Sequence, residues 1–452
     1  MESQLISRRP DGSELGAVRK TSIDELPGIL ARARKGEEAL RQLGLEGRER
    51  ILREAGARLR ADLEAIAAIA SEEMGKPLRE SLGEARHAFA HIDRDITEIF
   101  DALRDEVLVE GKYRSTIVRD PFGVAACITP WNFPTLMPHQ QIFPALAAGN
   151  AVIFKPSEEV PLTAEAYIER FRGLLPDGAL TLIHGEGDLG EALVKSDVDL
   201  IVFTGSRQVG KSILQEAAKS FKRVILELGG KDPLIVLEDA DLDAAAAFAA
   251  RNSFWNAGQV CVSTERIFIH RDRAESFIEK LVGHAEKIAV GDPLEEGVRL
   301  GPMVNIAQKK RVHREVEEAI RAGAMLQYRG TREDGAFLGP IVLGGLEPNM
   351  PIAVEETFGP VAGVVPTESD EESIRLANDS RFGLGAVVFG SPERARAVAR
   401  RLRAGMVGIN QGIYGAGNTP WVGARESGYG FHSGRDGHRQ FAQIRVIHET
   451  IQ

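Results

Sequence analysis

The spacing of apolar residues divides the chain into a helical first quarter and a longer part in which two patterns alternate. From about Ser22 to Leu108, apolar residues recur every three or four positions, which predicts helices over 29–43, 48–70 and 86–107. The segment 112–130 then reads as extended strand with a turn at Asp120-Pro121.

Beyond this segment, short runs rich in β-branched residues are separated by helical runs such as 163–175 and 208–220. The predicted strands cover 123–128, 150–155, 179–184, 199–205 and 222–228. Strands and helices that alternate at this pace imply right-handed crossovers. The sequence therefore predicts a parallel, doubly wound sheet covered by helices.

The alternation restarts after Gly229-Gly230, and we place a domain boundary there. Strands are predicted over 233–240 and 265–271, with helices over 241–254 and 274–288. The last apolar run, 440–452, reads as a terminal strand. No internal repeat or low-complexity linker interrupts the chain.

Composition supports this division and narrows the function. A chain of 452 residues with 43% hydrophobic and 27% charged residues is typical of a soluble protein with two domains. No apolar run approaches the ~20 residues of a membrane helix, and the N-terminus has no signal-peptide pattern. The net charge of -10, with no basic run, argues against nucleic acid or a membrane as a partner.

The chain has only two cysteines, Cys127 and Cys261, so no disulfide framework is expected. This usage indicates a reduced, cytoplasmic location. Cys127 lies in an apolar run, where a cysteine is a small buried hydrophobe. Cys261 lies between glycine-rich and polar residues, and its own context leaves a structural and a catalytic role open.

Two segments have the pattern of a phosphate-binding loop. Gly185–Gly190 matches G-x-G-x-x-G, but it follows a late strand rather than the first strand of a nucleotide-binding unit. A tight strand-to-helix turn is therefore the better interpretation. Ser206 directly follows the strand 199–205 and precedes a helix. At this position the sequence is equally compatible with an N-cap and with a phosphate contact.

Four polar residues lie at or just after the ends of predicted strands, at the edge where open α/β sheets bind ligands. Lys155 and Glu158 close one strand and have groups suited to ribose hydroxyls. Glu227 ends another, where burial would raise its pKa toward that of a general base. Asn132, held between two prolines, has a rigid amide suited to an oxyanion. Each of these has a purely structural alternative when it is taken singly.

Taken together, the motifs resemble those of the NAD(P)-dependent aldehyde dehydrogenase superfamily. They are TPWNFP, KPSE, FTGS with Gly210, ELGGK, GQVC, EETFGP and ESGYG, in the family's order, with the cysteine 34 residues after Glu227. The resemblance extends from about Gly36 to the last strand.

The resemblance implies a catalytic role for Cys261, Asn132 and Glu227. Cys261 attacks the aldehyde, and the amide of Asn132 and the N–H of Cys261 hold the oxyanion. Hydride transfer to the nicotinamide leaves a thioester, which water activated by Glu227 hydrolyses. The matching cofactor contacts are Thr129, Trp131, Lys155, Glu158, Gly187, Gly205, Ser206, Leu228, Glu356 and Phe358.

The resemblance also implies a fold in three parts: an NAD(P)-binding domain, a catalytic domain and a small β extension. The first comprises 1–104 and 123–229, the second 230–439, and the extension 105–122 with 440–452. Because the extension would leave an exposed strand edge, we expect a homodimer or homotetramer. No metal is implied.

The cofactor is expected to be NAD, with NADP as the alternative, because the Glu158 carboxylate would repel a 2′-phosphate. The residues matching the family's aldehyde tunnel are Phe133, Met137, Gln140, Trp255 and Trp421, with Tyr414 nearby. An aromatic tunnel favours apolar, aromatic or cationic aldehydes. Gln140 stands where succinic semialdehyde dehydrogenases often have Arg, and Gln141 stands where many relatives have Lys or Arg.

Three other functions were considered. A CoA-acylating dehydrogenase would lack the base at Glu227, so the presence of this residue argues for hydrolysis. A non-catalytic binding or structural protein on the same fold would tend to have lost Cys261. Simple ester hydrolysis by the thiol would be a side activity.

Overall fold

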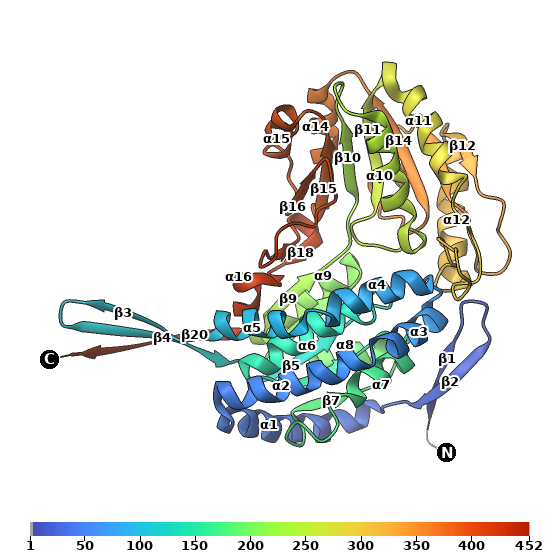
Figure 1. Cartoon of the computed structure of the whole chain (residues 1–452). Helices are drawn as coiled ribbons and strands as arrows, with labels where there is room; N and C mark the ends of the chain where they lie inside the picture. Colours follow the sequence, from blue (N-terminus) through green and yellow to red (C-terminus); the bar gives the residue numbers. More distant parts are fainter. Residues whose placement is uncertain (1–2, 452) are drawn as a thin grey trace.

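The computed structural model describes residues 3–451, which form two α/β lobes and a projecting three-stranded sheet (Figure 1). No helix within these residues is long and apolar enough to cross a membrane. The α/β fold class is as predicted, with a parallel sheet in each lobe and small antiparallel sheets beside them.

The first lobe is built on a six-stranded sheet with the order β18-β9-β8-β5-β6-β7. Its parallel strands are β5 (Val124–Ile128), β6 (Ala151–Lys155), β7 (Leu180–Leu182), β8 (Leu200–Thr204) and β9 (Arg223–Glu227). The helices of this lobe that precede the second sheet are α1 (Leu26–Gln42), α2 (Gly44–Ala61), α3 (Leu63–Met74), α4 (Leu78–Phe89), α5 (Ile92–Leu103), α6 (Leu136–Ala148), α7 (Pro161–Glu169), α8 (Gly187–Lys195) and α9 (Arg207–Ala217).

Both faces of this sheet are buried. Alternate residues of β5 belong to two different apolar clusters, Ala125 and Cys127 to one, Val124 and Ala126 to the other. Because successive side chains of a strand point to opposite faces, the clusters lie on either side of the sheet. This explains why these strands are continuously apolar.

The second lobe has a seven-stranded sheet with the order β12-β13-β14-β11-β10-β15-β16, parallel except for β12. The strands are β10 (Asp232–Val236), β11 (Thr264–His270), β12 (Met325–Arg329), β13 (Ile341–Gly344), β14 (Val361–Thr367), β15 (Gly385–Phe389) and β16 (Met406–Ile409). Its helices are α10 (Leu242–Phe254), α11 (Arg271–Ala285), α12 (Ile306–Arg321), α13 (Pro351–Val354), α14 (Asp370–Asn378) and α15 (Pro392–Ala399).

The projecting sheet consists of β3 (Glu106–Glu110), β4 (Tyr113–Pro121) and β20 (Ala442–Thr450), in the order β20-β4-β3. It extends away from both lobes in Figure 1. At the other end of the first lobe, β1 (Gln4–Arg8) and β2 (Glu14–Arg19) form a hairpin. Short 3-10 helices cover Ile23–Glu25, Ala218–Ser220, Trp255–Gly258 and Arg425–Ser427.

The structure departs from the predicted elements in three places. The predicted helix 86–107 covers the end of α4, all of α5 and the start of β3, because His91 has a non-helical backbone with φ -113° and ψ 22°. The predicted helix 48–70 is two helices, because Asp62 has a non-helical backbone with φ -109° and ψ 14°. After β16 the chain returns to the first lobe. There β18 (Gly428–Tyr429) pairs antiparallel with β9, and α16 (Gly434–Arg439) packs on α5, next to β17 (Trp421–Val422) and β19 (Phe431–His432). Part of the segment predicted as catalytic domain thus completes the first sheet.

Candidate active site

A cavity of about 1100 Å³ lies where the two lobes meet, lined by residues from both. Its floor includes the carboxyl ends of β8 and β9 and the loop after β5. The strand order reverses its direction at β5, which lies between β6 and β8. Ligands of open α/β sheets bind at such a switch point.

Glu227 is the last residue of β9 and is 5% exposed. Burial raises its pKa to about 7, against the opposing effect of hydrogen bonds from Cys261 and Trp421. The Trp421 indole nitrogen donates to Oε1 of Glu227 at 3.3 Å. A carboxyl with a pKa near neutrality is suited to accept a proton at physiological pH.

Cys261 follows a tight loop that begins with the 3-10 helix Trp255–Gly258. Asn256 and Ala257 both have φ near 50°, and Gly258 has φ 69°. A Cβ at Gly258 would lie 1.9 Å from the carbonyl oxygen of Gly359, so only glycine fits there. The loop places the Cys261 thiol in the cavity beside Glu227. Burial and the neighbouring carboxylate raise the thiol pKa well above its usual value.

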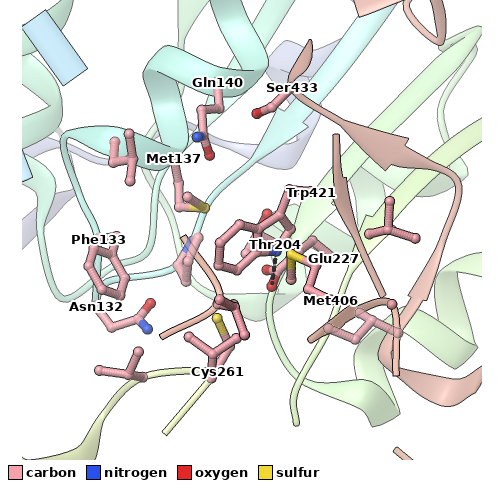
Figure 2. Close-up of a pocket in the computed structure, with 18 of the residues that line it drawn as sticks. Asn132, Phe133, Met137, Gln140, Thr204, Glu227, Cys261, Met406, Trp421 and Ser433 are labelled. Carbon is pink, nitrogen blue, oxygen red and sulfur yellow. Dashed lines mark hydrogen bonds between the residues drawn. The ribbon is translucent and has the colours of Figure 1, made fainter. Parts of the chain in front are cut away.

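Asn132 faces Cys261 from the loop between β5 and α6 (Figure 2). Its amide nitrogen donates one proton to the carbonyl oxygen of Gln259 at 3.0 Å. The second amide proton has no acceptor within residues 3–451, nor does the main-chain N–H of Cys261. These two free donors beside the thiol are of the kind needed to hold an oxyanion.

On the other side of Glu227, the cavity wall suits the phosphates of a dinucleotide. Ser206 caps α9 through a 3.4 Å hydrogen bond from Val209 N. The N–H groups of Arg207 and Gln208 donate to no described residue and are oriented by the helix start. Gly205 and Leu228 line the cavity beside them. The residues present therefore fit a phosphate at this helix.

Glu356 and Phe358 line the same wall from the second lobe. Gly230 N donates to Oε1 of Glu356 at 3.0 Å, and burial raises the pKa of Glu356 to about 8. The rings of Phe358 and Trp131 meet edge to face at 5.6 Å. A Cβ at Gly229 would approach the Glu356 carboxylate to 2.4 Å, which explains the glycine.

Four predicted cofactor residues lie outside the cavity, at the neighbouring strand ends: Thr129, Lys155, Glu158 and Gly187. Thr129 N donates to Lys155 O at 3.2 Å, and Lys155 Nζ lies 3.9 Å from Glu158 Oε2. Gly187 is the first residue of α8, and a Cβ at Gly190 would touch the Lys155 stem at 3.5 Å. The structure gathers these groups on one edge of the sheet.

Of the predicted tunnel residues, Phe133, Met137, Gln140 and Trp421 line the cavity. Trp255 does not, because it packs behind Phe133 with ring centroids 5.4 Å apart. The sequence did not indicate Met406, Ile413, Ser433 or His438, which also line it. No local pattern marks these four: Met406 begins β16 of the second lobe, and the other three lie after β16, where the chain returns to the first lobe. Gln141 turns away and donates to Thr204 Oγ1 at 3.1 Å.

Comparison with known proteins agrees with this site. The model of the "Aldehyde dehydrogenase family" matches residues 2–447. The chain is 37% identical to "Aminoaldehyde dehydrogenase 1, peroxisomal" of Pisum sativum over 417 residues, covering 88% of this chain and 82% of that protein.

Solved structures give the same result. The aldehyde dehydrogenase of Brucella melitensis biovar abortus 2308 is 34% identical, with a TM-score of 0.94, covering 100% of this chain and 94% of that one. An NAD-dependent aldehyde dehydrogenase of Sinorhizobium meliloti is 35% identical, with a TM-score of 0.94, covering 99% and 92%. The chain therefore belongs to the aldehyde dehydrogenase family, and it is an NAD(P)-dependent enzyme that oxidises an aldehyde to the carboxylic acid.

Proposed function

We propose that Cys261 is the nucleophile, Glu227 the general base and Asn132 the oxyanion donor of this oxidation. The observation that carries the proposal is that the Cys261 thiol, the Glu227 carboxylate and the Asn132 amide, with one amide proton free, line the same cavity. A nucleophile in contact with a base is the arrangement that activates a weakly acidic thiol.

The chemistry follows from these contacts. Glu227 takes the thiol proton as the sulfur forms a bond to the carbonyl carbon, and the carbonyl oxygen becomes an oxyanion held by Asn132 and Cys261 N–H. Bound NAD(P)+ supplies the acceptor for the hydride that leaves this carbon. After Glu227 has released the first proton to solvent, it accepts a proton from the water that attacks the thioester on Cys261. The carbon–sulfur bond breaks, the acid is released and the proton returns to the Cys261 sulfur.

Two variants test the assignment. Cys261→Ala should abolish NADH formation, and Cys127→Ala, at a buried cysteine outside the cavity, should retain it. Glu227→Gln should slow release of the acid more than the first release of NADH. Turnover that survives in Cys261→Ala, or unimpaired hydrolysis in Glu227→Gln, would refute the roles. Acid release without added CoA separates this function from CoA acylation.

We propose NAD as the preferred cofactor. The Glu158 carboxylate stands at the sheet edge beside Lys155, and its side chain is 43% exposed, so it is free to accept hydrogen bonds from a ribose diol. A phosphate on that ribose would meet the same carboxylate and be repelled. Equal concentrations of NAD+ and NADP+ should give a higher kcat/KM with NAD+, and a clear preference for NADP+ would contradict the proposal.

For the substrate, we propose an aldehyde with a short apolar body and an uncharged polar tail. Met137, Phe133 and Trp421 surround the thiol, and Figure 2 places Gln140 and Ser433 at the end of the cavity away from Cys261. The charged groups that line this end, Arg94 with Asp95 and Glu98, form ion pairs with one another at 3.3 and 3.8 Å.

Unpaired neutral groups support such a tail. Gln140 Oε1 and His139 Nδ1 are buried without a hydrogen-bond partner within the described residues, and burial lowers the pKa of His139 to about 3. Buried polar atoms without partners are costly, and a hydroxyl group on a ligand would satisfy them. Glyceraldehyde should lose about 10-fold in kcat/KM in Gln140→Leu, while propanal should not; equal losses would contradict the proposal.

We further propose a homodimer or homotetramer in the cytoplasm. Strands β3 and β20 form the two edges of the projecting sheet and expose large apolar residues, among them Leu108, Val109 and Ile444. Open, apolar strand edges favour pairing with a second chain. Both cysteines are free, as in a reducing compartment. Light scattering on the purified protein would contradict the assembly if it gave the monomer mass of 49.2 kDa.

A further inference from the structure

Two buried lysine–glutamate pairs contact segments that line the cavity. Lys76 Nζ is 2.5 Å from Glu84 Oε2, and both side chains are 1% exposed. Lys231 pairs with Glu265 in the same way, at 1% and 3% exposure. Ions are rarely buried so completely, and exchanging such a pair for apolar residues is often neutral for stability. Stability alone therefore does not explain them.

The first pair holds the loop that carries Asn132. Lys76 Nζ donates to the main-chain carbonyl of Asn132 at 2.6 Å and lies 4.2 Å above the centre of the Phe133 ring. Oε1 of Glu84 accepts from Thr135 N, from Thr135 Oγ1 and from Leu136 N, at 2.6 to 3.0 Å. The oxyanion loop is thus fixed at its centre and at its end.

The same network reaches the cysteine loop. Asn256 Nδ2 donates to Asn132 O and to Gln259 O, each at 3.3 Å, and Asn132 Nδ2 donates to Gln259 O at 3.0 Å. Glu80, one helical turn before Glu84, accepts from Asn256 N at 3.0 Å. Helix α4 therefore holds both loops, and the donor amide of Asn132 cannot move without breaking a contact to the loop of Cys261.

The second pair holds the turn that carries Glu356 and Phe358. Lys231 Nζ donates to Thr357 Oγ1 at 3.1 Å. Glu265 accepts from Thr357 N at 2.8 Å and from Phe358 N at 2.9 Å. These bonds also fix Phe358 in its left-handed backbone conformation, φ 51°. This pair has no contact with the oxyanion loop.

We infer that Lys76 is a positioning residue for the oxyanion donor Asn132, and that Lys231 is its counterpart for the cofactor turn. The inference rests on the roles proposed above for Asn132, Glu356 and Phe358. Lys76 acts through the main chain of Asn132 and through Glu84. Lys231 acts through the Thr357 hydroxyl and through Glu265, and neither lysine touches a reacting atom. The Lys76–Glu84 pair therefore affects the chemical step, and the Lys231–Glu265 pair affects cofactor binding.

The two substitutions Lys76→Met and Lys231→Met test this division, because they remove the same charge from equally buried pairs. Loss of an oxyanion donor costs 10²- to 10³-fold in rate, and displacement of one should cost about 10- to 100-fold. Lys76→Met should lower the rate of NADH formation in the first turnover by that factor and leave the KM for NAD+ within about twofold. Lys231→Met should instead raise that KM by about 10-fold.

Alkylation of Cys261 by iodoacetamide gives a readout without turnover. Lys76→Met should react as fast as the wild type, since the thiol and Glu227 are unchanged. If Lys76→Met does not fold, Asn256→Gly removes the other donor to Asn132 O at a position whose φ of 50° glycine tolerates. It should show the same slow first turnover.

The measurements distinguish a failure of the positioning roles from a failure of the catalytic assignment. Equal changes in rate and in KM for the two lysine variants would overturn the positioning roles. A first turnover within about twofold of the wild type in both Lys76→Met and Asn256→Gly would also overturn them. An active Cys261→Ala would instead refute the catalytic assignment on which they rest.

Discussion

The indole N–H of Trp421 donates to Oε1 of Glu227 at 3.3 Å, so a side chain of the substrate tunnel is bonded to the proposed general base. The two residues are 194 positions apart in the chain. They meet because the chain returns to the first lobe, where Gly428 pairs with Glu227. The proposed base is thus held from the side that we propose for the aldehyde.

The pH dependence of thioester hydrolysis should report this bond. Burial raises the pKa of Glu227 to about 7, and the bond from Trp421 opposes that rise. Hydrolysis should therefore increase as pH rises through about 7, and Trp421→Phe should move the midpoint to higher pH. The measurement is single-turnover acid release across pH 5 to 9. Trp255→Phe, behind Phe133, should leave the midpoint unchanged; an equal shift would argue against the bond.

The same raised pKa predicts how stability depends on pH. The folded pKa of Glu227, about 7, exceeds the unfolded value of 4.5. The stability that the neutral, buried carboxyl contributes is therefore fully present below about pH 4.5 and is lost as pH rises through 7. Above that pH the buried carboxylate costs roughly 3 kcal/mol. Glu227→Gln should therefore melt above the wild type at pH 8, with the difference shrinking toward pH 5. Thermal unfolding measures this, with exposed Glu110→Gln as control.

The glycine pair after Glu227 gives a steric prediction. In Gly229→Ala the new Cβ would lie 2.4 Å from Glu356 Oε2 and displace that carboxylate. The KM for NAD+ should rise by about 10-fold, because small misplacements at a binding site cost that much or more. In Gly283→Ala, on α11 and outside the cavity, the Cβ would meet nothing within 4 Å, and the KM should not change. An unchanged KM in Gly229→Ala, or an equal rise in both variants, would contradict the prediction.

The two cysteines should differ in reactivity. Cys127 is fully buried within the first sheet, and burial raises its pKa far above the ordinary range. Cys261 lines the cavity, although its own pKa is also raised. Iodoacetamide should therefore modify Cys261 alone, faster as pH rises from 7 to 9, with parallel loss of activity. Early labelling of Cys127, detected by mass spectrometry, would contradict the burial of that cysteine.

Asn150 should contribute strongly to stability. Its Oδ1 accepts from Phe122 N and Gly123 N at 2.7 and 3.1 Å, and its Nδ2 donates to Ala145 O and Phe441 O at 3.1 and 2.9 Å. Asn150→Ala would leave several buried backbone groups unpaired, at a cost on the order of 3 kcal/mol. The melting temperature should fall by several degrees, and by much less in the partly exposed Asn378→Ala. An unchanged melting temperature would show that water replaces these bonds.

Much of the first lobe could be predicted from the sequence because its strands are local patterns. The prediction over 199–205 became Leu200–Thr204, and that over 222–228 became Arg223–Glu227. Strands buried on both faces are short runs of β-branched and apolar residues, which a single chain displays without reference to its neighbours. Because parallel strands align their carboxyl ends, the residues that follow them were expected to face one crevice, as Glu227 and Asn132 do.

The remaining features depend on contacts between distant segments. Ser433 and His438 reach the cavity only through the late return of the chain, and Trp255 lies behind Phe133 rather than on the cavity wall. The role of Lys76 is visible only where Asn132 folds onto it, 56 positions later. The sequence alone determined the strands and the family motifs from which the role of Cys261 is proposed, because these are properties of contiguous residues. Which side chains shape the tunnel and which hold the catalytic loops in place was decided by packing between segments that share no local pattern.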